Sequence, residues 1–173
     1  FNIEILEGYG ATEASPVVAA NQWENNRPGT VGPLMAGMSS RLVPVEGMPE
    51  GGRLHIRGPN IMMGYLRPSN PGAIEKLIDG WHDTGDIVDI DADGFIRILG
   101  RVKRFAKIGG EMVSLAVVEN CAAAVWPDHM HAAVTLPDPR KGEQVVLLSE
   151  APEASRGPIL AWAQNHGVPE ISV

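Results

Sequence analysis

Four side chains in the first half of the chain have the chemistry needed to hold a nucleotide. The ring of Tyr9 can stack on a base, because an aromatic face suits any flat base. Glu13 can hold magnesium, which prefers oxygen ligands, and Thr12 can donate a hydrogen bond to a phosphate oxygen. The carboxylate of Asp86 can accept two hydrogen bonds from the vicinal hydroxyls of a ribose.

The elements that must position these residues are predicted to be mainly strands. Alternating or apolar runs predict strands, in chain order, over 1–6, 41–45, 53–57, 87–90 and 95–98. The first runs into a turn at 8–10, and Asp91-Ala92-Asp93-Gly94 joins the last two as a hairpin. The stretches 25–33 and 46–52 predict a loop and a turn. A short helix is predicted over 71–79, with Pro71 in its first turn and Gly80 just past its end.

The pattern changes after about residue 102. A basic run, Arg101 to Arg104, leads to Ser114, which can cap a helix over 115–125. The apolar face of that helix comprises Leu115, Val118, Cys121, Ala122 and Val125. The remaining predicted elements are strands over 131–136 and 144–148 and a helix over 158–165 that ends near Gly167. The sequence therefore predicts the α+β class, with a β-rich part to residue 102 and then a small α+β unit.

The composition excludes several classes of protein. The 173 residues carry a formal charge of −7, whereas a general nucleic-acid binder needs a basic face. The single cysteine, Cys121, cannot form an internal disulfide and indicates a reducing compartment. No run approaches the roughly 18 apolar residues of a membrane-spanning helix, and the first residues lack the pattern of a signal peptide. The missing initiator Met indicates either an excised piece of a longer protein or a start made by processing.

The acidic turn between residues 89 and 94 invites a calcium-binding interpretation, which we reject. Asp89, Asp91, Asp93 and Gly94 match the first half of an EF-hand loop. The twelfth position of that loop should be Glu, but it is Gly100, and the flanking residues are strand-like rather than helical. A hairpin therefore explains these residues better than a calcium site.

Three stretches, taken together, resemble the core motifs of the adenylate-forming, acyl-CoA synthetase-like superfamily. They are Gly8-Tyr9-Gly10-Ala11-Thr12-Glu13, Trp81-His82-Asp83-Thr84-Gly85-Asp86 and Gly100-Arg101-Val102-Lys103. Members of that superfamily activate a carboxylic acid with ATP, because a carboxylate is a poor electrophile, and pass the acyl group to a thiol. The stretch Lys107 to Leu115 narrows the resemblance to the acyl-acyl-carrier-protein synthetase half of the bacterial bifunctional 2-acylglycerophosphoethanolamine acyltransferases.

The resemblance implies a role for each residue that matches a motif. Nucleotide binding, of ATP or AMP, is implied for Tyr9, Gly10, Thr12, Asp86 and Arg101. Glu13 is implied to hold Mg²⁺, and the catalytic residues are implied to be Thr12, Glu13 and Lys107. Lys103 matches the hinge about which the small domain rotates between adenylation and thioester formation. Gly109 and Gly110 match the pantetheine tunnel, where the lack of a side chain allows close approach.

The same resemblance implies a longer parent protein and its partners. Residues 1–102 match the end of the large domain, including strands of a distorted β-barrel, and 103–173 match the first part of a truncated, mobile α+β domain. The implied substrate is a long-chain fatty acid and the implied acceptor is acyl carrier protein. A lysophospholipid would be reacylated by an acyltransferase half at the cytoplasmic face of the bacterial inner membrane. The sequence contains neither the upstream phosphate loop nor the late lysine of the family, so we expect these residues alone to be inactive in adenylation.

Several alternatives stay open at the level of sequence. CoA presents the same pantetheine as the carrier protein, so a fatty acyl-CoA ligase of the same superfamily fits the motifs nearly as well. A non-catalytic module that binds an acidic partner through its basic run, Arg101 to Lys107, belongs to a different class. Single-stranded nucleic-acid binding ranks last. Glu13 and Asp86 also fit simple turn positions beside strands.

Overall fold

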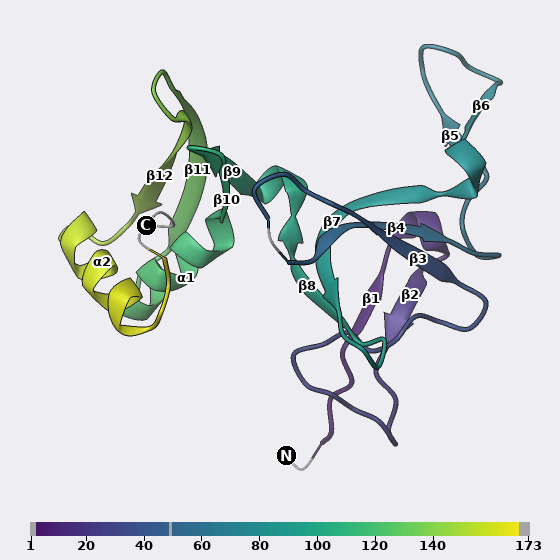
Figure 1. Cartoon of the computed structure of the whole chain (residues 1–173), viewed down its shortest axis with the longest axis horizontal. Coiled ribbons are helices and arrows are strands. Elements are labelled where there is room, and N and C mark those ends of the chain that lie inside the picture. Colours follow the sequence, from purple (N-terminus) through teal and green to yellow (C-terminus); the bar gives the residue numbers. More distant parts are fainter. Residues whose placement is uncertain (1–2, 49, 170–173) are drawn as a thin grey trace. The chain divides into compact units, whose positions relative to one another are not determined.

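The computed structural model describes residues 3–48 and 50–169, and these divide into two compact units (Figure 1). Of the described residues, 3–45 and 50–99 form the first unit and 46–48 and 100–169 form the second. Strands dominate and helices are few, which confirms the α+β class predicted from the sequence. The assignment of residues 1–102 and 103–173 to the large and small domains of an adenylate-forming enzyme stays a prediction.

The first unit is built from short strands. Their bounds are β1 Gly8–Gly10, β2 Val17–Ala20, β3 Ser39–Val43, β4 Gly52–Arg57, β5 Gly64–Leu66, β6 Ile74–Lys76, β7 His82–Ile90 and β8 Ile96–Arg101, the last of which continues into the second unit. Single 3-10 turns occupy Thr12–Ala14 and Ile78–Gly80. Strands β3, β4, β7 and β8 form one sheet in that order, while β1–β2 and β5–β6 are separate pairs. Over the described residues these sheets do not close into a barrel.

The core of the first unit lies on one face of the four-stranded sheet. In β4, Leu54 and Ile56 are fully buried while His55 between them points to the other face, so the alternation predicted for 53–57 is confirmed. Val88 of β7 and Ile96 of β8 join the same buried cluster. Burial of each of these aliphatic side chains stabilises the unit by about 1.5–3 kcal/mol. The sheet whose strand β7 carries Asp86 is therefore packed against a hydrophobic core.

The first described strand lies outside residues 1–6, for which the alternating pattern predicted a strand. Residues 3–7 form no regular element, and residues 1 and 2 of the predicted strand lie outside the described residues. The predicted turn at 8–10 is instead strand β1, which pairs with β2. A Cβ on Gly10 would lie 2.6 Å from the carbonyl oxygen of Pro16, so this glycine permits close approach to the returning chain.

The helix predicted over 71–79 is wrong. The segment forms strand β6, which pairs with β5, and then a 3-10 turn. Gly72 and Asp79 have φ angles of +89° and +51°, which a right-handed helix does not permit. Nε of Arg67 lies 3.0 Å from Oε2 of Glu75 beside this pair of strands, an interaction that a local sequence pattern does not reveal.

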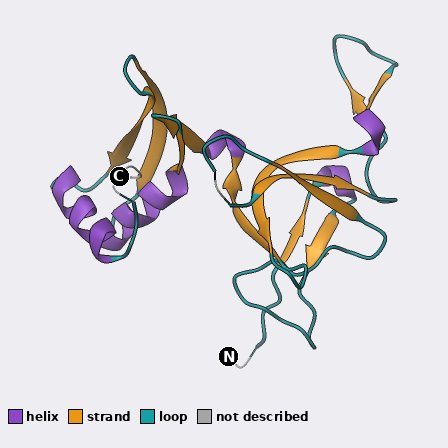
Figure 2. Ribbon diagram, in the orientation of Figure 1, coloured by secondary structure: helices purple, strands orange, loops and turns teal. Residues whose placement is uncertain are grey.

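The second unit combines a four-stranded sheet with two helices, which lie beside each other in Figure 2. After a 3-10 turn at Val102–Arg104, the bounds are β9 Phe105–Ile108, β10 Glu111–Ser114, α1 Leu115–Val125, β11 His131–Asp138, β12 Gly142–Ser149 and α2 Arg156–Asn165. The strand order is β10-β9-β12-β11. None of the helices in the described part of the chain has the length and apolar character that a membrane span requires.

The predicted apolar face of α1 is confirmed. Leu115 and Val118 pack with the sheet, and Cys121 and Ala122 pack in a second cluster with α2. Ser114 occupies the N-cap position as predicted, but its side chain makes no capping hydrogen bond. The second helix begins two residues earlier than the predicted 158–165, at Arg156, and ends where predicted.

Two glycines of the loop that follows β2 provide a matched test of how closely that loop packs against β2 in the first unit. A Cβ on Gly32 would lie 2.2 Å from the carbonyl oxygen of Ala20, whereas one on Gly29 would meet no atom within 4 Å. Both have positive φ, +78° and +82°, so both substitutions strain the backbone equally. We predict that Gly29→Ala lowers the free energy of unfolding by about 1–2 kcal/mol and Gly32→Ala by about 3 kcal/mol or more. Urea denaturation followed by circular dichroism measures both, and equal losses would contradict the close approach of Gly32 to β2.

Candidate nucleotide site

A hydrogen bond joins two of the predicted site residues, Tyr9 and Asp86, which are 77 positions apart in the chain. The hydroxyl of Tyr9 on β1 donates to Oδ2 of Asp86 on β7 at 2.5 Å. Asp86 is only 4% exposed, and a buried carboxylate needs such donors to offset its lost hydration. The structure thus brings together two residues for which the sequence suggested separate roles.

The order Thr-Gly-Asp explains how the backbone of Asp86 is held. Oγ1 of Thr84 donates to the carbonyl oxygen of Leu54 on β4 at 2.9 Å and accepts the amide of Asp86 at 3.1 Å. Gly85 has a φ of +73°, and its amide donates to Oδ1 of Asp83 at 3.0 Å. These bonds tie the turn to the central sheet. The carboxylate of Asp86 therefore projects from a fixed point.

Glu13 lies in the 3-10 turn after β1, half-buried beside Tyr65. The hydroxyl of Tyr65 on β5 donates to Oε1 of Glu13 at 3.2 Å, and the amide of Met62 donates to the carbonyl oxygen of Glu13 at 2.9 Å. Burial first, and the charge of Glu13 second, raise the pKa of Tyr65, so its phenol stays protonated and can donate. Thr12 in the same turn is exposed. Sequence reasoning missed Tyr65, because it belongs to strand β5, which was not predicted, and lies 52 positions from Glu13 in the chain.

The carboxylate of Glu13 fits a magnesium site that phosphate and water oxygens complete. Among residues 3–48 and 50–169, no three His, Cys, Asp or Glu side chains gather in a way that could hold a metal by themselves. Magnesium retains several waters and is usually bound by one or two carboxylates plus phosphates, so one carboxylate suffices. The metal itself stays a prediction.

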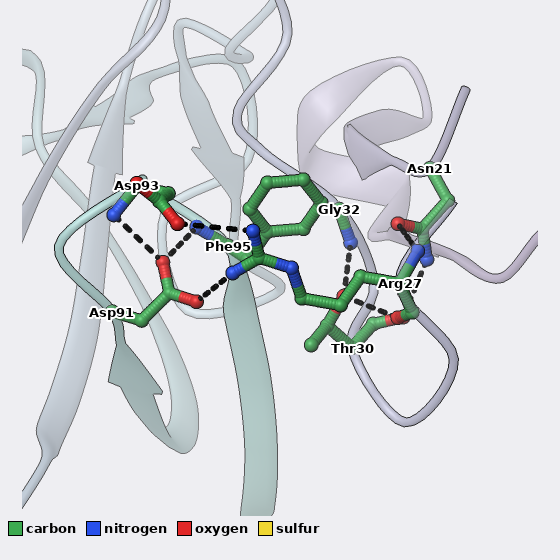
Figure 3. Close-up of polar contacts among 7 residues, drawn as sticks. All are labelled: Asn21, Arg27, Thr30, Gly32, Asp91, Asp93 and Phe95. Atoms are coloured by element: carbon green, nitrogen blue, oxygen red, sulfur yellow. Dashed lines mark hydrogen bonds and ion pairs between the residues drawn. The ribbon is translucent and has the colours of Figure 1, made fainter. Parts of the chain in front are cut away.

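Arg27 neutralises the acidic turn between β7 and β8 (Figure 3). Its Nη1 lies 2.5 Å from Oδ2 of Asp91 and its Nη2 lies 3.0 Å from Oδ2 of Asp93. Its guanidinium carbon lies 3.8 Å from the centre of the Phe95 ring. Oδ1 of Asp91 accepts the amides of Asp93 and Phe95, so the predicted hairpin is confirmed. The pairing with Arg27 also accounts for the acidic residues that first suggested calcium.

The loop that carries Arg27, residues 21–32, follows β2 in the chain and contacts this hairpin through hydrogen bonds and ion pairs. The side chain of Asn21, which is 4% exposed, donates to the carbonyl oxygen of Thr30 at 2.7 Å and accepts the amide of Arg27 at 3.2 Å. At the end of the loop, the amide of Ile96 donates to the carbonyl oxygen of Gly32 at 3.1 Å. Strand β2 pairs with β1, which carries Tyr9, and the hairpin begins with β7, which carries Asp86. The loop therefore helps to hold Tyr9 and Asp86 near each other.

The other predicted site residues belong to the second unit: Arg101, Lys103, Lys107, Gly109 and Gly110. Nζ of Lys107 lies 2.7 Å from Oε2 of Glu46, and its hydrogen bond lowers the pKa of Glu46. Gly109 and Gly110 form the turn between β9 and β10, with φ angles of +60° and +97°. An added Cβ on either would meet nothing within 4 Å, so within this unit the turn alone requires glycine. The participation of these five residues in one site with Tyr9, Glu13 and Asp86 stays a prediction, as does the hinge at Lys103.

Several known proteins resemble this chain in sequence. The family model described as AMP-binding enzyme matches residues 1–66, which include β1, the turn of Glu13 and Tyr65. The peroxisomal OPC-8:0-CoA ligase 1 of Arabidopsis thaliana is 39% identical over 82% of this chain, and the long-chain-fatty-acid–CoA ligase of Salmonella typhimurium is 31% identical over 94%. The matched regions are 27% and 30% of those two proteins, so the chain spans less than a third of their length.

A solved structure resembles the chain in fold. The crystal structure of ATP-bound MatB from Rhodopseudomonas palustris superimposes with a TM-score of 0.73 at 30% sequence identity. The match covers 93% of this chain and 34% of that protein.

Two tyrosines provide a graded test of the hydrogen bonds at this site. We predict that Tyr9→Phe lowers the free energy of unfolding by about 1.5–3 kcal/mol, because it removes a donor to the buried carboxylate of Asp86. Tyr65→Phe should cost less than about 1 kcal/mol, because its bond to Glu13 is longer and the carboxylate is better hydrated. Denaturation in urea measures both variants. A larger loss of unfolding free energy for Tyr65→Phe would contradict the prediction that the Tyr9–Asp86 bond stabilises the unit more.

Proposed function

This chain belongs to the superfamily of AMP-binding enzymes, and from that premise we propose that it forms part of an ATP-dependent ligase that joins a carboxylic acid to a thiol through an acyl-AMP intermediate. The observation that carries the proposal is the Tyr9–Asp86 hydrogen bond. It places a buried carboxylate in the same unit as Glu13, in a part of the chain similar to ligases that use CoA.

Different residues of the first unit bind different parts of the nucleotide. The Asp86 carboxylate accepts the hydroxyls of the ribose, and the Tyr9 hydroxyl holds that carboxylate in place. The ring of Tyr9 stacks on the base, and Thr12 donates to a phosphate. Glu13 would hold magnesium, which when bound neutralises phosphate charge. Fixing the nucleotide in this way leaves the attacking carboxylate a defined approach to the α-phosphorus.

CoA is the acceptor that the observations favour over acyl carrier protein. The Arabidopsis and Salmonella relatives are named as CoA ligases. An acidic carrier protein requires exposed positive charge, yet two cations of the basic run are already paired. Nη2 of Arg104 lies 2.5 Å from Oε2 of Glu119, and Lys107 pairs with Glu46. The charge left for a carrier protein is therefore smaller than the sequence indicated.

Acyl carrier protein remains the second candidate acceptor. Lys103 is exposed in the 3-10 turn before β9, where it could contact an acidic partner. The resemblance of Lys107 to Leu115 to a carrier-protein ligase also favours it. Reacylation of a lysophospholipid depends on that resemblance alone.

The direct test is thioester formation by the full-length parent protein. We expect ATP, magnesium and a long-chain fatty acid to yield acyl-CoA when CoA is supplied, with the product identified by mass. Holo acyl carrier protein, supplied instead, should give little or no product. Exclusive acylation of the carrier would replace CoA by the second candidate, and release of neither AMP nor thioester would contradict the ligase proposal.

A variant pair then tests the residue assignment. Asp86→Asn should lower the rate of acyl-AMP formation by about 10- to 100-fold, because a neutral amide binds the ribose hydroxyls more weakly than a carboxylate. Asp89→Asn, on the same strand, should change the rate by less than about twofold. Equal effects would show that Asp86 does not contact the nucleotide, and circular dichroism checks that both variants fold.

A further inference from the structure

A hollow of about 350 Å³ lies on the outer face of the central sheet of the first unit. Its lining includes Arg41 of β3, His55 of β4, Tyr65 of β5, Lys76 of β6, Trp81 and Asp83. Because side chains alternate along β4, this face is opposite to the one that buries Leu54 and Ile56. The hollow is therefore a feature of the polar face and not a defect of the core.

Two arginines contact the indole ring of Trp81, which lines this hollow; Arg41 lines the hollow too, whereas Arg57 lies beside it. Arg41 lies directly across from His55, and Arg57 directly across from Ser39, so the two arginines are diagonal neighbours on one face of the β3–β4 pair. Their guanidinium carbons lie 4.5 Å and 4.9 Å from the centre of the Trp81 ring. The ring thus attracts two cations to the same face of the sheet.

The positive charge of these arginines is not matched by nearby acids. Among residues 3–48 and 50–169, neither Arg41 nor Arg57 lies within salt-bridge distance of a carboxylate. The two acids that line the hollow are engaged elsewhere. Nη2 of Arg53 lies 2.5 Å from Oδ2 of Asp83, and Glu75 pairs with Arg67. Partial burial acts to raise the pKa of Asp83, but the hydrogen bonds from Arg53 and the Gly85 amide outweigh it and keep the carboxyl ionised.

The chemistry of this arrangement selects a doubly charged oxyanion. Two guanidinium groups on one ring repel each other, and a ligand of charge −2 between them would relieve that repulsion. Guanidinium donors match the oxygens of phosphate in pairs, and a phosphate dianion carries twice the charge of a carboxylate. The volume lies within the range of small-ligand sites. We propose that this hollow, which Arg41 and Trp81 line and beside which Arg57 contacts the same ring, binds a phosphate group of a small ligand.

The neighbourhood of the hollow indicates where such a phosphate comes from. Tyr65 lines the hollow and also donates to Glu13, the residue proposed to hold magnesium. If the proposed ligase activity holds, the phosphate belongs either to the pyrophosphate end of ATP or to the nucleotide end of the thiol acceptor. The choice between these two sources rests on the proposed function, but phosphate binding itself does not.

Calorimetric titration of the 173-residue chain tests the site without any assay of ligation. One arm uses inorganic pyrophosphate and the other adenosine 3′,5′-bisphosphate, both at constant ionic strength. Arg41→Gln and Arg57→Gln should each weaken binding by about 10-fold or more, because each removes a charged donor. Arg97→Gln, an exposed arginine on β8 that does not line the hollow, is the matched control and should bind as the unmodified chain does.

Each outcome decides the proposal. Binding of either probe that is weakened in Arg41→Gln and in Arg57→Gln and kept in the control supports it, and the probe that binds identifies the source of the phosphate. Absence of binding of both probes at millimolar concentration would overturn it. Equal weakening in all three variants would also overturn it, because that pattern indicates general charge attraction. Circular dichroism confirms folding of each variant. Loss of ligase activity in the parent protein would leave these binding results unaffected.

Discussion

The hydrogen bond from Tyr9 to the buried carboxylate of Asp86 is the interaction on which the proposed site depends. It joins a three-residue strand near the start of the chain to the longest strand of the central sheet, and it survives only if those strands keep their relative position. Two features maintain that position. The aliphatic core fixes β4, β7 and β8 as one body, and loop 21–32 connects β2 to the β7–β8 hairpin through Asn21 and Arg27. Glycines at 10 and 32 allow the close backbone approaches that these links require.

The distribution of charge in the first unit follows from the same geometry. Although the chain carries a net charge of −7, the acids around the site are paired: Asp91 and Asp93 with Arg27, and Asp83 with Arg53. Exposed ion pairs of this kind add little to stability, but they fix the turns from which functional side chains project. Arg41 and Arg57 differ, because they meet an indole ring instead of a carboxylate. An acidic chain thus keeps local positive charge on one face, where an anionic ligand would need it.

Local patterns predicted the elements that local forces determine. The bounds of α1, the burial alternation of β4 and the Asp91–Gly94 hairpin were all found, because periodicity and turn residues encode them within a few positions. Strands β1, β2, β5, β6, β9 and β10 were missed, because three or four residues are too few for a local pattern to show an alternation. The same limit applies to the site. Motif spacing suggested Tyr9, Glu13 and Asp86 separately, but the Tyr9–Asp86 bond and the roles of Tyr65 and Arg27 depend on pairings across 50 or more positions.

The most direct test of the central claim is a crystal structure of the full-length protein with AMP bound. Both ribose hydroxyls should lie within hydrogen-bond distance of the Asp86 carboxylate while the hydroxyl of Tyr9 still donates to it. The base should stack against the ring of Tyr9, with the phosphate on the side of Thr12 and Glu13. AMP bound with its ribose away from Asp86, or a structure in which the Tyr9–Asp86 bond is broken to admit the nucleotide, would contradict the account.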